Sequence, residues 1–269
     1  MLALRLPIAI ALLLSAAARK ITFPPAIGLM DQRILGHGGN IDVTSGPAFA
    51  GLTTYANLPY VHCLAGDDEV EKYDIAILGA PFDTLARERD LALEEFDKAL
   101  GELRQRQLGI YTRIVSGRTS NSSDFKTPRI VTLGGDHTTT LSALRSTYHR
   151  WGPVSVIHFD SHIDTWDPDV LGGGISSYAG VNHGTFLHIA HEEGLIRNTS
   201  IHAGIRAPMV RPKGDMRNDI RCGFQMIKAR DIDRIGINGV IDRLKERVAG
   251  SRVYISVDID VLDPAYAPG

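Results

Sequence analysis

Apolar and polar positions along the chain follow two patterns that together predict an α/β protein. Short apolar runs lie at residues 74–79, 129–133, 154–159, 200–205 and 253–257, as expected for buried strands. Between them, residues 91–108, 138–148, 185–193 and 240–248 space their apolar side chains as amphipathic helices do. Strands that alternate with helices predict βαβ units, and therefore a mostly parallel sheet covered on both faces.

The first 70 residues lack this alternation and predict two further segments. Arg5 precedes an apolar run at residues 6–14, and Ala16, Ala17 and Ala18 resemble a signal-peptidase site. We therefore interpret residues 1–18 as a signal peptide, with an uncleaved anchor as the alternative, and expect entry into the secretory pathway. Residues 19–70 are rich in Gly, Pro, Asn and Thr and are interpreted as an N-terminal extension, so the main domain spans residues 71–269.

Composition narrows the possible partners. Hydrophobic residues make up 43% and charged residues 22% of the 269 positions, and the formal net charge is −2. Without a basic surface, nucleic acid and anionic membranes are not expected as partners. Cys63 and Cys222 are the only cysteines, and whether they pair is left open, as is glycosylation at Asn121 and Asn198.

Polar residues that can hold metal follow three of the predicted strands. The carboxyl ends of parallel strands share one edge of a sheet, where open α/β sheets bind ligands. The sequence places two histidines and five aspartates there: Asp136, His137, Asp160, His162, Asp164, Asp258 and Asp260. Because so many carboxylates repel one another, the pattern predicts bound divalent cations. Imidazole and carboxylate without thiolate suit Mn²⁺ better than structural zinc.

Some of these residues also have purely structural interpretations. An isolated Asp-x-Asp is often a turn or a helix cap, but an Asp-x-His-x-Asp run after an apolar strand has few structural uses. His158 lies inside a predicted strand and is interpreted as a hydrogen-bonded core residue, and His188 and His191 as part of a solvated helix face. His183 follows a Gly/Ser-rich loop that could cover the site, so it is a candidate proton carrier.

The motifs resemble those of the ureohydrolase family, which includes arginases and agmatinases. The resemblance rests on Gly134-Gly135-Asp136-His137, on Asp160-Ser161-His162-Ile163-Asp164-Thr165, and on residues 256–264. Asn182-His183-Gly184-Thr185 and His202-Ala203-Gly204-Ile205-Arg206 are more similar to agmatinases, in particular to their secreted fungal branch. The resemblance implies a three-layer α/β/α sandwich of the arginase type.

The resemblance also implies a site and a reaction. Two Mn²⁺ ions would activate water for attack on a guanidinium carbon, releasing urea and an amine, with agmatine as the expected substrate. One ion would be held by His137, Asp160, Asp164 and Asp258, and the other by His162, Asp160, Asp258 and Asp260. Asp164 would orient the attacking water, and His183 would act as acid and base or contact the substrate.

Two departures from the family pattern bear on these expectations. Residues 85–90 stand where the family has a longer loop, and the sequence stops at Gly269 where the family continues through further βα units. The expected sandwich is therefore incomplete at the C-terminus, and a homo-oligomer is expected for the full-length form. Guanidinobutyrate or arginine as substrate, or an inactive relative that only binds metal, remain alternatives.

Overall fold

The structure is a computed structural model that describes residues 73–80, 107–111, 114, 127–171 and 180–267. The chain divides into two compact units. The first comprises residues 1–81 and 110–135, and the second comprises residues 82–109 and 136–269. The expected signal peptide and N-terminal extension lie outside the described residues.

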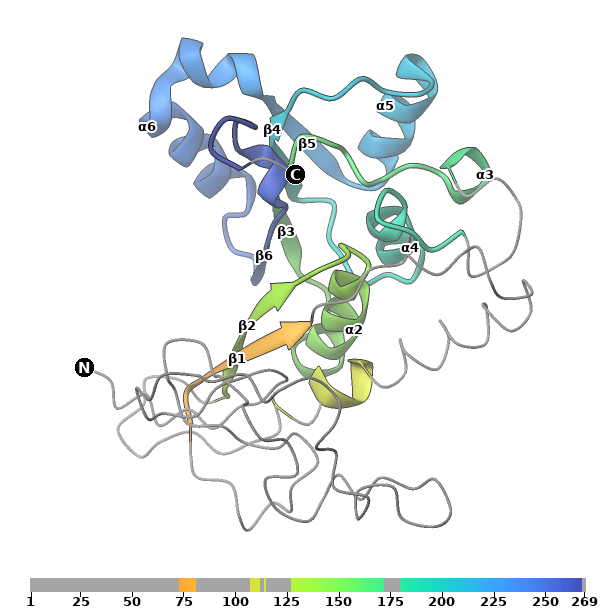
Figure 1. Cartoon of the computed structure of the whole chain (residues 1–269), viewed down its shortest axis with the longest axis vertical. Helices are drawn as coiled ribbons and strands as arrows, with labels where there is room; N and C mark the ends of the chain where they lie inside the picture. The colour runs from red at the N-terminus through yellow and green to blue at the C-terminus, as the bar shows by residue number, and fades with distance from the viewer. Residues whose placement is uncertain (1–72, 81–106, 112–113, 115–126, 172–179, 268–269) are drawn as a thin grey trace, which may run out of the picture. The chain divides into compact units, whose positions relative to one another are not determined.

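The first unit contains a parallel pair of strands, β1 (Ile75–Ala80) and β2 (Arg129–Gly134), drawn in Figure 1. Ile75 pairs with Arg129 and Ala80 pairs with Gly134. The hydroxyl of Tyr73 donates to the carbonyl of Ile114 at 2.6 Å, which fixes the chain just before β1.

The second unit is built on a four-stranded parallel sheet. Its strands are β3 (Ser155–Phe159), β4 (Ser200–Ile205), β5 (Phe224–Lys228) and β6 (Val253–Val257). Their spatial order is β5-β4-β3-β6, and every neighbouring pair is parallel. Because the strands are parallel, their carboxyl ends all lie along one edge of this sheet.

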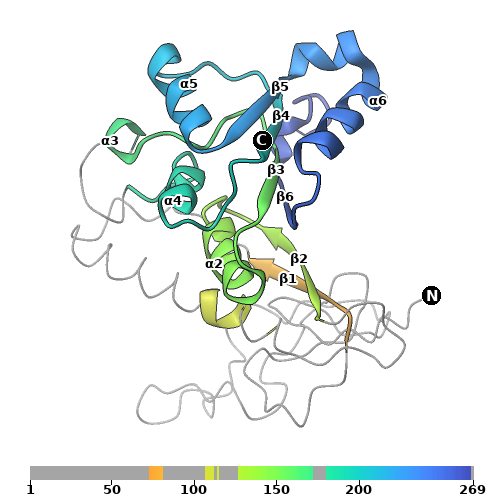
Figure 2. The same cartoon turned by 180° about the vertical axis from the view of Figure 1, so that it is seen from behind.

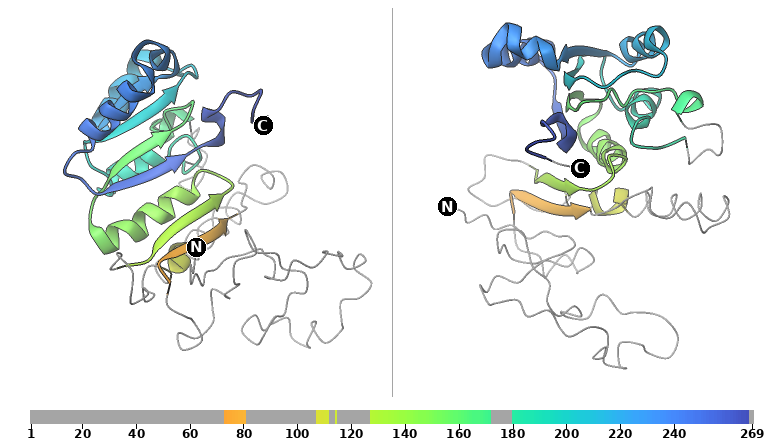
Figure 3. Two further views of the ribbon diagram at one scale, coloured as in Figure 1. Left: turned by 90° about the vertical axis from the view of Figure 1, so that its left-hand side faces the viewer. Right: turned by 45° about the horizontal axis from the view of Figure 1, so that its top comes forward.

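Helices cover both faces of this sheet, as the alternating strands and helices predict. On one face, α2 (Thr139–Trp151) and α4 (Phe186–Glu192) bury Leu144 and Phe186 against Val156 and Phe224. On the other face, α6 (Ala229–Arg247) packs Leu244 against Ile201 and Ile227. Figures 1 and 2 show the sheet between α6 on one side and α4 and α5 (Pro212–Arg221) on the other, and Figure 3 shows α6 along its face.

Most predicted elements are confirmed within one or two residues, and the misses have local causes. All five predicted strands are present. β5, α5 and the short α3 (Pro168–Leu171) were not predicted, since α5 has few apolar residues, α3 has only four residues, and Gln225 and Lys228 interrupt the apolar residues of β5. The helix predicted at 240–248 is the second part of α6, which is kinked at Gly236 (φ 67°). The predicted helix 91–108 lies outside the described residues except for positions 107 and 108, which are helical.

The helices of the described segments are short or polar by the standard of a membrane span. None of them combines the length and the apolar character that a membrane span requires.

Candidate metal centre

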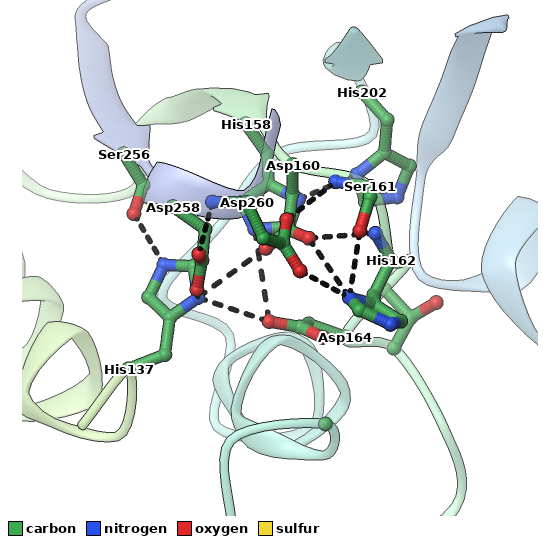
Figure 4. A network of polar contacts seen from close by, with 12 residues as sticks. His137, His158, Asp160, Ser161, His162, Asp164, His202, Ser256, Asp258 and Asp260 are labelled. Atoms are coloured by element: carbon green, nitrogen blue, oxygen red, sulfur yellow. Dashed lines mark hydrogen bonds and ion pairs between the residues drawn. The ribbon is translucent and has the colours of Figure 1, made fainter. Parts of the chain in front are cut away.

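The register between β3 and β6 brings together the two motifs that end these strands. Phe159 pairs with Val257, so Asp160 and Asp258 are the next residues on neighbouring strands. The amide of Asp258 donates to the carbonyl of Phe159 at 2.8 Å, which extends the pairing to the first polar residue. Two aspartates far apart in sequence therefore lie side by side at the carboxyl edge of the sheet (Figure 4).

Hydrogen bonds to α5 hold the loop that follows β3. The side-chain amide of Asn218 in α5 donates to the carbonyl of Thr165 at 2.5 Å, and the indole of Trp166 donates to Asp215 at 3.0 Å. Within this loop Asp164 has φ 49°, a left-handed conformation that non-glycine residues seldom adopt. Strain of this kind persists where surrounding contacts enforce it and is concentrated at functional sites. The left-handed conformation of Asp164 directs its buried carboxylate toward the cluster.

His137 enters the cluster from the residues before α2. Its Nε2 lies 2.7 Å from the hydroxyl of Ser256 in β6, which orients the ring. Its Nδ1 lies 3.0 Å from Asp164 Oδ2 and 3.4 Å from both Asp160 Oδ2 and Asp258 Oδ2. This buried Nδ1 makes no hydrogen bond in the structure despite three neighbouring carboxylates.

A second group of donors lies next to the first and shares Asp160 with it. His162 Nδ1 is 2.8 Å from Asp260 Oδ2 and 3.4 Å from Asp160 Oδ1. The amide of His162 donates to Asp160 Oδ1 at 2.6 Å, and the amide of Ser161 donates to Asp260 Oδ1 at 3.0 Å. The two oxygens of Asp160 thus face different neighbours, Oδ2 toward His137 and Oδ1 toward His162.

The charges of these groups depend on one another. Burial opposes a charge on His137, but its contacts with Asp160, Asp164 and Asp258 outweigh this and raise its pKa well above the ordinary value. Contact with Asp160 raises the pKa of His162 to about 9. Burial likewise opposes a charge on Asp160, but the three imidazoles around it hold its pKa far below the usual range. Burial raises the pKa of Asp164 to about 6.

The donor atoms fit divalent cations. Two ligands about 2.1 Å from one ion and at right angles to each other lie about 3 Å apart. The contacts of 2.8–3.4 Å in this cluster match that spacing. In two groups of residues, one ligand atom from each residue lies within 4.8 Å of the others: His137, His158, Asp160 and Asp164 form one group, and Asp160, His162 and Asp260 form the other. A cation in the first group would bind Nδ1 of His137, which makes no hydrogen bond.

The structure thus assembles the six expected metal-site residues: His137, Asp160, His162, Asp164, Asp258 and Asp260. Asp136, at the same edge in sequence, has another use, because its carboxylate accepts from the amide of Thr138 at 2.8 Å ahead of α2. His183 is exposed in the turn before α4, and within the described residues no hydrogen bond or ion pair joins it to the cluster. The Gly/Ser-rich loop before it lies largely outside those residues.

Three other histidines clarify the sequence interpretation. His158 is fully buried and hydrogen-bonded, as predicted, but it also lies among the donors of the first group. His188 is buried, with Nδ2 of Asn218 3.1 Å from its Nδ1, so its assignment to a solvated face is wrong, whereas His191 is partly exposed. His202, which belongs to the motif at residues 202–206, is also fully buried. Local spacing in the sequence does not predict this burial.

Arg206 supports the centre in a way that the sequence analysis did not identify. Its guanidinium donates to the carbonyls of Asp260 at 2.5 Å, Val261 at 3.2 Å and Leu262 at 3.1 Å. These carbonyls belong to or adjoin the short helix η4 (Ile259–Val261), which follows Asp258. One side chain therefore holds the segment that carries Asp260. The sequence signal that could have indicated this role of Arg206 is the motif at residues 202–206.

Fold and site together define a parallel α/β protein with a His/Asp cluster that can hold divalent cations at the carboxyl edge of its sheet. Comparison with known proteins agrees with this class. Residues 107–269 match the arginase family. A Schizosaccharomyces pombe protein named "Putative agmatinase 1" is 38% identical over 90% of this chain and 73% of its own length. A second one, "Putative agmatinase 3", is 35% identical over 82% of this chain and 66% of its own length.

A solved structure supports the fold assignment. Proclavaminate amidino hydrolase from Streptomyces clavuligerus aligns with a TM-score of 0.54 at 24% identity, covering 73% of this chain and 72% of that one. The chain therefore belongs to the arginase family, with the arginase-like α/β fold and mostly parallel sheets. It is a hydrolase of the class that acts on C–N bonds in linear amidines.

Proposed function

We propose that the chain is a manganese-dependent amidinohydrolase that converts agmatine and water into putrescine and urea. The observation that carries the proposal is the buried Nδ1 of His137, which has no hydrogen bond and faces carboxylates of Asp160, Asp164 and Asp258. The choice of agmatine is supported by the names of the two fission-yeast relatives.

The donor types favour manganese as the resident metal. Within the cluster the donors are imidazole nitrogens and carboxylate oxygens, a set that suits Mn²⁺ and similar ions of intermediate hardness. His137, Asp160, Asp164 and Asp258 would hold one ion, and His162, Asp160, Asp258 and Asp260 the other. When bound, such a pair supplies Lewis acidity, which makes a nucleophile available from water near neutral pH.

The remaining tasks belong to side chains. Asp164, buried and held in a strained conformation, would orient the attacking water by accepting a hydrogen bond from it. Hydrolysis then needs a proton for the departing amine. His183 is assigned this transfer because it is exposed to solvent and matches the acid/base histidine that the resemblance to ureohydrolases implies.

Urea release from a panel of guanidino compounds tests the proposal directly. The Mn²⁺-loaded chain is incubated with agmatine, 4-guanidinobutyrate and arginine, and urea is measured over time. We expect release from agmatine to be fastest, and release from all substrates to stop when a chelator removes the metal. Fastest release from guanidinobutyrate or arginine would reassign the substrate. Stoichiometric Mn²⁺ binding without urea release would favour a relative that only binds metal.

A further inference from the structure

A cavity that contains none of the expected metal ligands lies in the second unit, at the carboxyl edge of the sheet. Its volume is about 930 Å³, within the range usual for small-molecule sites. The ends of β4 and β5 and the start of α5 surround it (Figure 1), and the last residues of the two strands, Ile205 and Lys228, are register partners. Open α/β sheets bind ligands at this edge, so the cavity is well placed for a ligand of its own.

The lining of this cavity combines two kinds of side chain. Among the described residues that line it, five are Lys or Arg, seven are apolar, and none is acidic or neutral and polar. The whole chain has a formal net charge of −2, so five cationic residues around one cavity do not reflect its overall composition. The side chains therefore offer ion pairing and apolar contact, and none of them offers the neutral hydrogen bonds that recognise a sugar or a base.

Three of the cationic side chains have no counterion. Lys213, Arg217 and Arg230 make no ion pair with a carboxylate in the described part of the chain. The two acidic residues of α5 do not neutralise them, because Asp215 and Asp219 are 2% and 1% exposed and accept hydrogen bonds from the loop after β3. Positive groups that converge without a counterion repel one another, and a bound anion relieves this repulsion.

The apolar part of the lining is rich in methionine. Met209 and Met226 are partly buried and pack with Ile205 and Trp166. Met216 adds a third methionine from α5. The methionine side chain is flexible and polarisable, so it adapts to ligands of varied shape. This surface suits an alkyl chain or a ring better than it suits a polar group.

We propose that the cavity binds an amphipathic anion. Its carboxylate or phosphate head pairs with Lys213, Arg217 and Arg230, and its alkyl or aryl tail lies on the methionines. Agmatine and putrescine are cations, so this ligand is neither the proposed substrate nor the proposed amine product. The site therefore goes beyond the proposed function and does not depend on it.

Titration calorimetry on the metal-free full chain tests the ligand class. The probes are decanoate and decyl phosphate, each below its micelle concentration, with acetate and decyltrimethylammonium as controls. We expect at least one decyl anion to bind more than about 10-fold more tightly than either control, since acetate lacks the tail and decyltrimethylammonium lacks the negative charge. The tighter of the two anions identifies the head group as carboxylate or phosphate.

A pair of double substitutions locates the binding site of the tighter anion. Lys213→Gln with Arg217→Gln should lower its affinity by about 10-fold or more, because two charged partners are lost. Arg243→Gln with Lys245→Gln is the matched control. It removes the same charge from exposed positions on α6 that do not line the cavity, and it should bind the anion as the wild type does.

NMR of the chain labelled with ¹³C at the methionine methyl groups tests the position of the tail. The anion should shift the signals of Met209, Met216 and Met226, assigned by replacing each with leucine. The proposal is overturned if neither decyl anion binds, or if decyltrimethylammonium binds equally well. It is also overturned if the two double variants lose equal affinity, or if the three methionine signals do not move. None of these measurements uses metal or urea release, so a failure of the proposed function would leave their outcome unchanged.

Discussion

Asp160 and Asp258 lie side by side because Phe159 and Val257, the residues before them, are register partners on β3 and β6. Both carboxylates contact the same nitrogen of His137 at 3.4 Å. The parallel register therefore forces two negative groups into one small space. Their repulsion in a partly buried site is relieved by positive charge, which the imidazoles supply without metal and which cations would supply in the loaded form.

Replacing Asp160 should abolish the centre rather than half of it. Its two oxygens face different histidines, so Asp160→Asn removes a ligand from both proposed ions. We expect Mn²⁺ affinity to fall by more than about 100-fold, since losing an outer contact alone costs about 10–100-fold. Titration calorimetry and metal analysis measure the loss. Asp242→Asn, an exposed carboxylate on α6, is the control and should bind two ions as the wild type does.

This centre was largely predictable from sequence, because the information is local. Asp160, His162 and Asp164 alternate after an apolar strand, and Asp258 and Asp260 do so after another. The parallel-strand rule then places both motifs at one edge. What the sequence did not contain was the register. Only the pairing of Phe159 with Val257, and of His158 with His202, shows which side chains touch.

Metal binding should release protons at neutral pH. The pKa of His162 is raised to about 9 by contact with Asp160, so its imidazole is protonated at pH 7 in the metal-free protein, whereas a metal ligand must be neutral. Mn²⁺ affinity should therefore rise between pH 6.5 and 9. Calorimetry in two buffers of different ionisation enthalpy measures the protons released. His162→Asn should release fewer, and equal release by both proteins would contradict the assignment.

The stability of the metal-free chain should show the opposite trend. A group whose folded pKa is raised stabilises the fold below its unfolded pKa, and this contribution is lost as pH rises through the folded value. For His162 the window runs from about 6.5 to about 9. We expect the unfolding temperature in chelator to fall across this window, and to fall less in His162→Asn. A stability that rises with pH in chelator for the wild type alone would refute this.

Glycine at position 204 should be necessary for the segment that follows β6 to keep its position. It has φ +105°, and a Cβ atom there would lie 2.5 Å from Val261 Cγ2 and 3.2 Å from the carbonyl oxygen of Asp160. Gly204→Ala should cost about 1–3 kcal/mol in backbone strain and also displace η4, lowering metal affinity. Gly250→Ala is the matched control, because φ is +72° there but no atom lies within 4 Å of the added Cβ. The unfolding temperature should fall in both variants, whereas Mn²⁺ affinity should fall only in Gly204→Ala.

α5 escaped prediction because its sequence contradicts its environment. α5 is strongly polar, yet Asp215 and Asp219 on it are buried because Trp166 and His202 contact them. A helix with buried carboxylates has no apolar stripe, so periodicity does not reveal it. The same contacts fix the loop that carries Asp164. The unpredicted helix α5 is thus an element that supports the site.

His183 provides the sharpest separation of chemistry from metal binding. It is exposed, and in the described part of the chain it has no contact with the cluster, so its removal should leave the donor set intact. If it transfers a proton to the departing amine, His183→Asn should lower kcat by about 100-fold or more. Mn²⁺ stoichiometry and unfolding temperature should stay at wild-type values. His191→Asn, on the short helix that follows His183, is the control for a general change in α4 and should keep full activity. Wild-type kcat in His183→Asn would exclude this residue from catalysis, and loss of Mn²⁺ in that variant would instead make it part of the metal site.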